Sequence, residues 1–235
     1  TYQVESGKLP GPVRLALITD FHSCDYGEGQ AALMDAVRAA APDLVLLGGD
    51  ILDDDLPPDN ALELAGLLAA GFPCYYVSGN HEYRSGRVSG YKESLRALGV
   101  TVLEGERVTV TVGDRALALC GVDDPSIGED RWSAQLAACA AGEGGRYTVL
   151  LTHRPERIDA YLEYPFDLIL AGHAHGGQWR IPGLVNGLIA PNQGVFPKYA
   201  GGRYDLGDSV LVVSRGLARE STRIPRFYNR PELVL

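Results

Sequence analysis

Three stretches that share one pattern decide the fold of this chain. Residues 13–22 read VRLALITDFH, residues 43–53 read DLVLLGGDILD and residues 73–82 read PCYYVSGNHE. Each stretch is a short apolar run that ends in polar residues, and such a run is typical of a strand buried on both faces. Asp20, Asp50 and Asn80 follow the runs at equal intervals of 30 residues, about the length of one strand–helix–strand unit. We therefore expect these three side chains to converge on one edge of a sheet.

Apolar runs alternate with helical patterns along the rest of the chain, which predicts an α/β fold with largely parallel strands. Helices are expected at residues 30–41, 60–70, 91–98, 131–141 and 155–162, and further strands at residues 147–151, 166–171, 178–181, 210–213 and 232–235. Three β-like runs at residues 101–103, 108–112 and 116–120 lie close together, with glycine-containing turns between them. This hairpin-like middle indicates a mixed arrangement and a second sheet.

The length and composition of the chain fit one domain. Of its 235 residues, 46% are hydrophobic and 22% are charged, which is enough to bury a full core. We therefore expect a single domain over residues 1–235, with residues 1–12 as an N-terminal extension. Residues 182–205 form a long irregular stretch with three prolines and five glycines. Such loops are usually functional or mobile, so this stretch is either a lid or rim of a site or a plain surface segment.

The charge balance argues against a nucleic-acid partner. The formal net charge is −9, from 21 basic and 30 acidic residues, whereas binding to a phosphate backbone needs clustered Lys and Arg. No apolar run approaches the roughly 20 residues that a membrane span requires. The sequence begins with Thr1 instead of Met, so the question of an upstream export signal or membrane anchor stays open. The localisation and any membrane association therefore stay open as well. The oligomeric state is also open.

The positions of the histidines are the most informative feature of the sequence. The chain has five, and all of them follow a predicted strand: His22, His81, His153, His173 and His175. In open α/β sheets, ligands bind at the carboxyl ends of the strands. Each motif alone is weak, because Asp-x-His is otherwise a capped turn and Gly-Asp is otherwise a helix start or an Asx-turn. An ordered set of five such strand ends is typical of a metal site.

Carboxylate, imidazole and amide ligands in this mixture suit divalent Mn, Fe, Zn or Co better than calcium. There are enough of them for two ions. The four cysteines have no C-x-x-C spacing, which argues against a cysteine zinc site. Two metals can clamp the attacking and leaving oxygens of an in-line displacement at phosphorus and lower the pKa of a bound water. A nearby free histidine can then protonate the leaving group.

The ordered motifs resemble the calcineurin-like metallophosphoesterase superfamily. The motifs are Asp20-x-His22, Gly49-Asp50-x-x-Asp53, Gly79-Asn80-His81-Glu82, His153 and Gly172-His173-x-His175. The resemblance implies a four-layer α/β/β/α sandwich of two mixed sheets flanked by helices, with the metal site at the carboxyl ends of the strands. The stretch at residues 172–182, with Ser214-Arg215-Gly216, looks like a bacterial phosphodiesterase subgroup similar to the relatives of UDP-2,3-diacylglucosamine pyrophosphatase.

The resemblance also implies a role for each motif residue. Asp20, His22 and His175 would hold the first metal, and Asp50 would bridge both ions. Asn80, His153 and His173 would complete the second site. His81 would act as general acid or charge stabiliser at the leaving oxygen. Asp53 would hydrogen-bond His81 and favour its protonated form, and Glu82 would anchor its own loop. The cofactors would be two divalent ions, most simply Mn, Fe or Zn.

One departure from a branch of this superfamily bears on the substrate. Protein serine/threonine phosphatases continue the second motif as Asp-Arg-Gly, and their Arg binds phosphate. This chain reads Asp53-Asp54-Asp55, which argues against a phosphoprotein phosphatase. The acidic run is then either the solvated start of a helix or an extra cation site. Five other bases either bind the phosphate, form a rim that attracts an anionic substrate, or simply lie on a solvated face. They are Arg84, Arg154, Arg215, Arg219 and Arg223.

The function expected from these residues is metal-dependent hydrolysis of a phosphodiester or pyrophosphate by in-line attack of a metal-bridging hydroxide, with His81 assisting the leaving group. The substrate would be a small-molecule or lipid-linked phosphoester. The first alternative is a phosphomonoesterase or nucleotidase on the same scaffold. The second is a non-catalytic interaction module, although such proteins typically lose ligands that this chain retains. A metallo-β-lactamase-type hydrolase would need His-x-His-x-Asp-His, which is absent.

Overall fold

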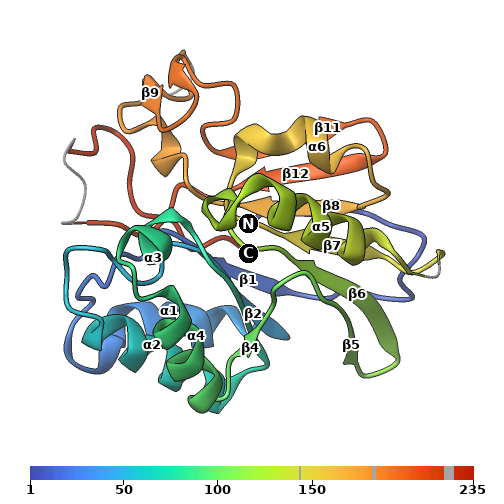
Figure 1. Ribbon diagram of the computed structural model, residues 1–235, viewed down its shortest axis with the longest axis horizontal. Helices are drawn as coiled ribbons and strands as arrows, with labels where there is room; N and C mark the ends of the chain where they lie inside the picture. The colour runs from blue at the N-terminus through green and yellow to red at the C-terminus, as the bar shows by residue number, and fades with distance from the viewer. Residues whose placement is uncertain (143, 182–183, 220–224) are drawn as a thin grey trace.

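The computed structural model describes residues 1–142, 144–181, 184–219 and 225–235 (Figure 1). Its strands are β1 (Leu15–Ile18), β2 (Leu44–Gly48), β3 (Cys74–Val77), β4 (Thr101–Val102), β5 (Arg107–Val112), β6 (Arg115–Gly121), β7 (Thr148–Leu151), β8 (Leu168–Ala171), β9 (Ile189–Ala190), β10 (Gly194–Val195), β11 (Gly202–Leu206) and β12 (Ser209–Val213). Its α-helices are α1 (Ala31–Ala40), α2 (Asp59–Gly71), α3 (Asn80–Arg84), α4 (Val88–Ala97), α5 (Glu129–Ala140) and α6 (Ile158–Tyr161). Short 3-10 turns occur at Glu28–Gln30, Pro125–Ile127, Pro155–Arg157 and His175–Gly177.

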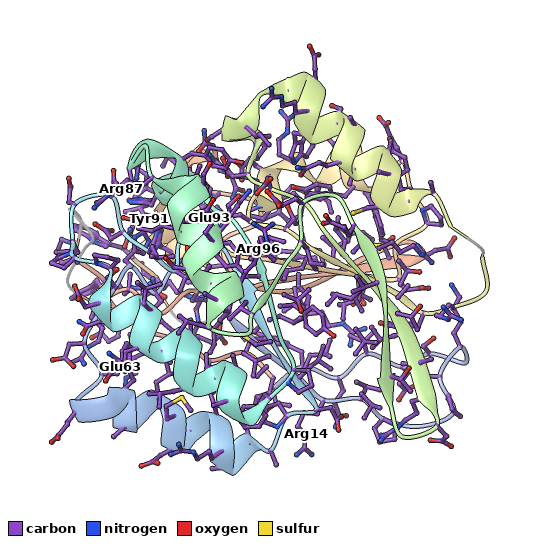
Figure 2. The ribbon with its side chains drawn as sticks, turned by 60° about the horizontal axis from the view of Figure 1, so that its bottom comes forward. Arg14, Glu63, Arg87, Tyr91, Glu93 and Arg96 are labelled. Atoms are coloured by element: carbon purple, nitrogen blue, oxygen red, sulfur yellow. The ribbon has the colours of Figure 1, made fainter. Side chains whose placement is uncertain are left out.

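The first half of the chain forms a four-stranded parallel sheet in the order β1-β2-β3-β4. All five residues of β2 are buried, which explains why its sequence is continuously apolar instead of alternating. The helices α1, α2 and α4 lie side by side on the outer face of this sheet (Figure 2). On α4, Tyr91 and Leu95 are buried while Glu93 and Arg96 are exposed, as expected for a helix with one face in the core.

The second half forms a mixed six-stranded sheet in the order β11-β12-β8-β7-β6-β5. Its four inner strands are parallel, and each edge strand pairs antiparallel with its neighbour. The hairpin expected in the middle of the sequence is therefore β5–β6 at one edge. Helices α5 and α6 cover the outer face of this sheet (Figure 1).

Three apolar clusters fill the spaces between four layers. One lies between α1, α2, α4 and the first sheet, and includes Met34 and Leu64. The second joins the two sheets through side chains such as Leu46 and Leu119. The third, around Trp132, packs α5 and α6 on the second sheet. The predicted α/β/β/α sandwich is confirmed, with the refinement that the named strands of the first sheet are all parallel, while an antiparallel bridge joins Leu17 to Val234.

The C-terminal third differs from the expectation in three places. Residues 178–181 and 232–235 were predicted as strands, but they make only isolated bridges: Trp179 to Phe227, Ile181 to Val185 and Val234 to Leu17. Within the predicted loop at residues 182–205, of which 182 and 183 lie outside the described residues, the structure has β9, β10 and most of β11. These strands are short and form local hairpins, β9 with β10 and β11 with β12, whereas the bridges of Trp179 and Val234 join residues distant in the sequence. Hydrophobic periodicity reveals neither.

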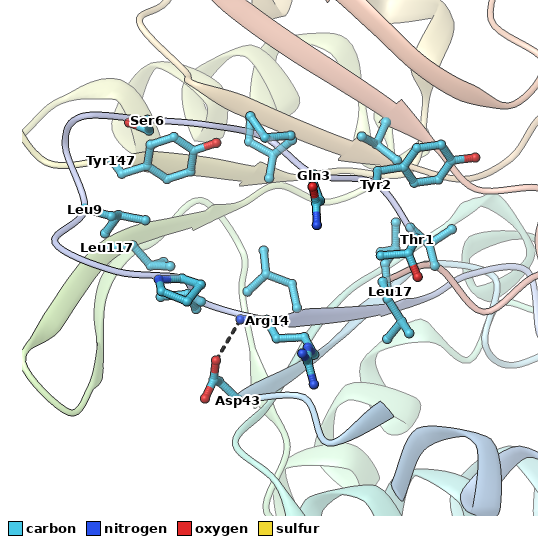
Figure 3. A pocket seen from close by; sticks show the side chains of 18 of the residues that line it. Thr1, Tyr2, Gln3, Ser6, Leu9, Arg14, Leu17, Asp43, Leu117 and Tyr147 are labelled. Atoms are coloured by element: carbon cyan, nitrogen blue, oxygen red, sulfur yellow. Dashed lines mark hydrogen bonds between the residues drawn. The ribbon is translucent and has the colours of Figure 1, made fainter. Parts of the chain in front are cut away.

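The N-terminal residues pack against the end of the molecule opposite the candidate site. Tyr2 N donates to the carbonyl oxygen of Leu235 (2.7 Å), and Lys8 Nζ lies 2.7 Å from Asp167. Residues 1–14 border a cavity of about 960 Å³ whose floor includes Leu17, Leu117 and Tyr147 (Figure 3). This cavity lies at the amino ends of the strands, away from the histidines. No helix among the described residues is long and apolar enough to cross a membrane.

Candidate metal centre

The loops that follow β1, β2, β3, β7 and β8 bring the predicted ligands together at the carboxyl ends of the strands. Asp20, His22 and His175 form one group in which ligand atoms lie within 4.8 Å of one another. A second group of the same dimension consists of Asp50, His153 and His173. All six side chains are buried, as is Asn80 at the start of α3. Two further candidate groups share residues with the acidic run: His22, Asp53 and His81, and Asp53, Asp54 and Asp55.

The backbone at these loops is unusually shaped. Five of the seven predicted ligands have left-handed φ angles: Asp20 (49°), His22 (51°), Asp50 (50°), His173 (65°) and His175 (46°). Non-glycine residues seldom adopt this conformation, and strained backbone clusters at functional sites. Glycine is required where loops meet closely, since a Cβ on Gly79 would lie 2.2 Å from Asp50 Oδ1 and one on Gly172 would lie 2.6 Å from Asp20 Oδ2.

Hydrogen bonds fix the orientation of the buried rings. His22 Nδ1 lies 2.8 Å from Asp53 Oδ2, and His153 Nδ1 lies 2.9 Å from the carbonyl oxygen of Gly48. A carboxylate and a carbonyl oxygen can only accept, so Nδ1 carries a proton in both rings. In a neutral ring the Nε2 lone pair is then free to bind a cation. Such outer partners of ligand histidines are a general feature of metal sites.

Several polar atoms in the site are buried without any hydrogen-bond partner. They are His22 Nε2, Asn80 Oδ1 and His175 Nδ1, and beside them Asp50 Oδ2 has His153 Nε2 at 3.1 Å. A buried polar atom without a partner costs about 1–3 kcal/mol, so a cluster of them indicates a missing ligand. Nitrogen, carboxylate and amide oxygen donors in this mixture fit divalent transition metals. The residues present therefore fit the metal ions that the sequence predicts.

Burial and charge set the protonation of the site. Burial disfavours the charged form of Asp50, but the attraction of His153 is stronger, because its Nε2 lies 3.1 Å from Asp50 Oδ2. The pKa of Asp50 therefore falls well below its usual value. Burial likewise opposes the charge on His153, yet Asp50 raises the pKa of that ring to about 10. Burial lowers the pKa of His175 to about 3 and holds the pKa of His173 well below its usual value, with help from His153 and Arg154. Ligand histidines must be neutral, so metal binding would displace the proton of His153.

His81 lies at the mouth of the site with partners that differ from the prediction. Asp53 Oδ2 is 3.5 Å from His81 Nδ1, and its hydrogen bond goes to His22 instead. Asp54 contacts His81 Nδ1, and Arg84 contacts His81 Nε2. Burial, together with the charges of His22 and Arg84, lowers the pKa of His81 despite Asp50 and Asp54. The predicted Asp53–His81 hydrogen bond is therefore wrong in this structure, and Asp53 orients His22.

Glu82 anchors its loop, as predicted. Its carboxylate accepts hydrogen bonds from the backbone N–H groups of Asp50, Ile51, Leu52 and Gly79, at 2.8–3.1 Å. The side chain is fully buried. These bonds tie the loop after β2 to the loop after β3, and so hold Asp50 next to Asn80.

The candidate phosphate-binding bases fall into two groups. Arg154 binds Asp124 and Asn192, and its Nη1 also lies 2.9 Å from His173 Nε2. Arg215 binds Glu232, and Arg219 donates to the carbonyl oxygen of Asp25. Arg223 lies outside the described residues. Arg84 differs, because its side chain is 53% exposed and it contacts both His81 and Asp54. The acidic run is therefore not simply a solvated face, since Asp53 and Asp54 face the histidines.

Sequence reasoning missed three residues of the site. Asn192 Oδ1 lies 2.9 Å from His173 Nε2, so the stretch predicted as a lid or rim does reach the ligands. Asn229 Nδ2 donates to the carbonyl oxygen of His175 (2.6 Å) and fixes its loop. Arg226 places a guanidinium near Asp20 and His175, with Nε and Nη2 buried and unpartnered. All three come from irregular segments whose sequence carries no periodic signal.

Comparison with known proteins shows the family to which the chain belongs. The sequence model of the family described as calcineurin-like phosphoesterase matches residues 13–177. The chain belongs to this family. It is 28% identical over 232 residues to the uncharacterized metallophosphoesterase YkuE of Bacillus subtilis (strain 168), covering 94% of this chain and 77% of that protein. It is also 28% identical over 231 residues to phosphodiesterase YaeI of Escherichia coli (strain K12), covering 95% and 81%.

Solved structures support the same fold. The NAD nucleotidase NadN of Haemophilus influenzae superimposes with a TM-score of 0.58 at 17% identity, covering 87% of this chain and 45% of that one. The phosphopantetheinyl hydrolase PptH of Mycobacterium tuberculosis gives a TM-score of 0.55 at 12% identity, covering 90% and 93%. At these identities the likeness concerns the fold. As a member of the calcineurin-like family, the chain is a metal-dependent phosphoester hydrolase.

Proposed function

We propose that the protein hydrolyses phosphodiester or pyrophosphate bonds at a centre of two divalent metal ions. The observation that carries this proposal is the cluster of buried, unpartnered ligand atoms at the carboxyl ends of the strands. Asp20, His22 and His175 would hold one ion. Asn80, His153 and His173 would hold the other, and Asp50 would bridge the two. The ions would be Mn, Fe or Zn, and when bound they supply Lewis-acid stabilisation and an activated water for in-line attack.

The side chains at the mouth of the site would act on the leaving group and on the phosphate. His81 Nε2 lies 3.9 Å from Asp50 Oδ2, so the ring is adjacent to the ligands without being among the buried ones. With Arg84 moved from His81 Nε2 to the phosphate, that nitrogen could carry the proton that His81 would give to the leaving oxygen, and Asp54 at Nδ1 would orient the ring. Arg84, which is half exposed beside His81, would bind the non-bridging oxygens of the phosphate.

The preference for diesters rests on two observations. The relative YaeI, which aligns with 95% of this chain, is named a phosphodiesterase. The chain also has Asp53-Asp54-Asp55 where phosphoprotein phosphatases have Asp-Arg-Gly. A small-molecule or lipid-linked phosphoester therefore remains the proposed substrate class. Phosphomonoesterase or nucleotidase activity at the same centre is the alternative that the assay must separate.

The test is reconstitution of metal-stripped protein with Mn²⁺, Zn²⁺, Fe²⁺ or Mg²⁺ in turn. Each form is assayed on bis-p-nitrophenyl phosphate and on p-nitrophenyl phosphate, and bound metal is counted by elemental analysis. We expect two ions per chain and turnover of the diester that depends on metal. Because metal displaces the proton of His153, apparent metal affinity should rise with pH up to the pKa of about 10 given above. Preference for the monoester would favour the alternative, and failure to bind two ions would refute the proposal.

The contact between Asn192 and His173 gives a second prediction. Asn192 Oδ1 and Arg154 Nη1 both lie 2.9 Å from His173 Nε2, and Arg154 Nη1 also donates to Asn192 Oδ1 (2.6 Å). Asn192 therefore helps to hold the outer side of the ring and leaves Nδ1 for the second ion. Asn192→Ala is expected to weaken binding of that ion by about 10–100-fold, measured by calorimetric titration of the stripped protein. The matched control is Asn186→Ala, because Asn186 lies in the same stretch but its side chain contacts Gly201, Tyr204 and Arg180. Equal metal affinities for the two variants would contradict this role.

A further inference from the structure

Large hydrophobic side chains gather on one surface beside the candidate metal centre. Ten of them are exposed among the described residues, and eight belong to two segments, residues 179–196 and 227–228. We call these eight the apolar patch: Trp179, Ile181, Leu184, Ile189, Val195, Phe196, Phe227 and Tyr228. Leu184 is 80% exposed and Phe196 is 67% exposed. Contiguous exposed apolar surface of this kind marks an interaction site.

The two segments of the patch are held together by the backbone. Arg180 N donates to the carbonyl oxygen of Phe227 (3.0 Å), and Phe227 N donates to that of Gln178 (3.1 Å). Ile189 pairs with Val195 in the β9–β10 hairpin, and Leu188 N donates to the carbonyl oxygens of Gly177 and Trp179. The hairpin and its flanking loops project beyond the sheets at the upper left of Figure 1. The described residues of the patch thus lie on a protrusion that backbone hydrogen bonds hold together.

The charge of this region is opposite to that of the protein as a whole. The chain has a net charge of −9, yet residues 178–205 and 225–230 contain five bases and one acid, Asp205, which pairs with Arg203. Among these bases, Lys198 and Arg230 are exposed. Exposed Trp, Tyr and Phe side chains beside Lys and Arg are the combination that inserts into the interface of an anionic bilayer. A protruding surface also suits a bilayer, which needs no complementary groove.

We propose that the apolar patch docks the protein on an anionic lipid bilayer. The two aromatic–aliphatic segments enter the headgroup region, and the neighbouring bases contact lipid phosphates. Asn192, at the turn between β9 and β10, contacts His173, and Asn229 contacts the loop of His175. Docking therefore holds the candidate metal centre near the bilayer surface. Binding to the bilayer does not depend on the proposed function. Only the idea that docking brings the enzyme to a membrane phosphoester rests on that function.

The test is flotation with vesicles of phosphatidylglycerol and phosphatidylcholine in equal parts, and with vesicles of phosphatidylcholine alone. We expect binding to the anionic vesicles that weakens at high salt, because the Lys and Arg contacts are screened. Leu184→Glu combined with Phe196→Glu should reduce the partition coefficient at least about tenfold, since two apolar side chains no longer leave water. Leu98→Glu combined with Leu162→Glu is the matched control, because these leucines are 39% and 40% exposed and lie outside the patch.

Tryptophan fluorescence gives an independent readout. The chain has two tryptophans, of which Trp132 is buried and Trp179 belongs to the patch. In a Trp132→Phe background, emission should shift to shorter wavelength when anionic vesicles are added. Unchanged emission, or equal vesicle binding by the patch and control variants, would refute the proposal. A wild-type dimer that the patch variant converts to monomer would instead assign the patch to self-association. Turnover of the soluble diester shows that each variant is folded and separates this result from a failure of the proposed function.

Discussion

Asp50→Asn is expected to reduce metal-dependent diester turnover by at least about 10³-fold, which corresponds to roughly 4 kcal/mol of transition-state stabilisation. Asp50 lies in the loop after β2 and is fully buried among His22, His81 and His153. Its Oδ1 accepts from the backbone N–H of His81 (2.8 Å), while Oδ2 lies 3.1 Å from His153 Nε2. An amide of the same shape keeps the first contact but removes the negative charge with which Asp50 would bridge two cations.

The matched control for this substitution is Asp55→Asn. Asp55 follows in the same loop and also loses a carboxylate, but its side chain is exposed, and the one candidate group to which it belongs, with Asp53 and Asp54, is separate from the two buried ligand groups. The control should retain turnover within about threefold and two ions per chain, as is usual for surface substitutions. Asp50→Asn should bind fewer than two ions while its circular dichroism spectrum is unchanged. If the variant still bound two ions and turned over substrate at the wild-type rate, the bridging role of Asp50 would be wrong.

That the candidate ligands lie together could be predicted because it depends on parallel strands in both sheets and on the packing of one sheet against the other. Once residues 44–48 and the equivalent runs are recognised as buried parallel strands, the residues that follow them must lie at one edge. The loops after β1, β2, β3, β7 and β8 do so, and this is why Asp20, Asp50 and His153 meet. The left-handed φ angles of Asp20 and Asp50 could not be predicted, since they follow from contacts that the loops make after the sheet has formed.

The partners of the ligands were harder to predict than the ligands. Asp53 and Asp54 are neighbouring carboxylates, and only the course of the loop decides that Asp53 reaches His22 while Asp54 reaches His81. Asn192 reaches His173 because the chain folds back on itself before it. Leu188 N donates to the carbonyl oxygens of Gly177 and Trp179, which precede Leu188 by about ten residues in an irregular stretch. Such contacts depend on tertiary packing, for which hydrophobic periodicity gives no signal.

Lys92→Met is expected to lower the free energy of unfolding by about 3–5 kcal/mol, because it leaves a buried carboxylate without its cation. Lys92 lies on α4 and is 5% exposed, and its Nζ is 2.6 Å from Asp123 Oδ1 and 2.8 Å from Glu104 Oε1. Asp123 is fully buried after β6 and also accepts from Ser78 and Gln135. This network joins the ends of β3 and β6, one from each sheet, next to the loop that carries Asn80.

Arg96→Met is the matched control, because Arg96 contacts the same Glu104 from the same helix but its side chain is 47% exposed. An exposed pair contributes about 0–1 kcal/mol, so this variant should unfold close to the wild type in urea. Adding Asp123→Asn to Lys92→Met should recover more than about 1 kcal/mol, since the cost lies in the unpaired charge and not in the lost lysine stem. A loss below about 1 kcal/mol for Lys92→Met alone would show that Ser78 and Gln135 suffice to stabilise Asp123. The two sheets would then depend on apolar packing, and not on this ion pair, to hold their strand ends in register at the metal centre.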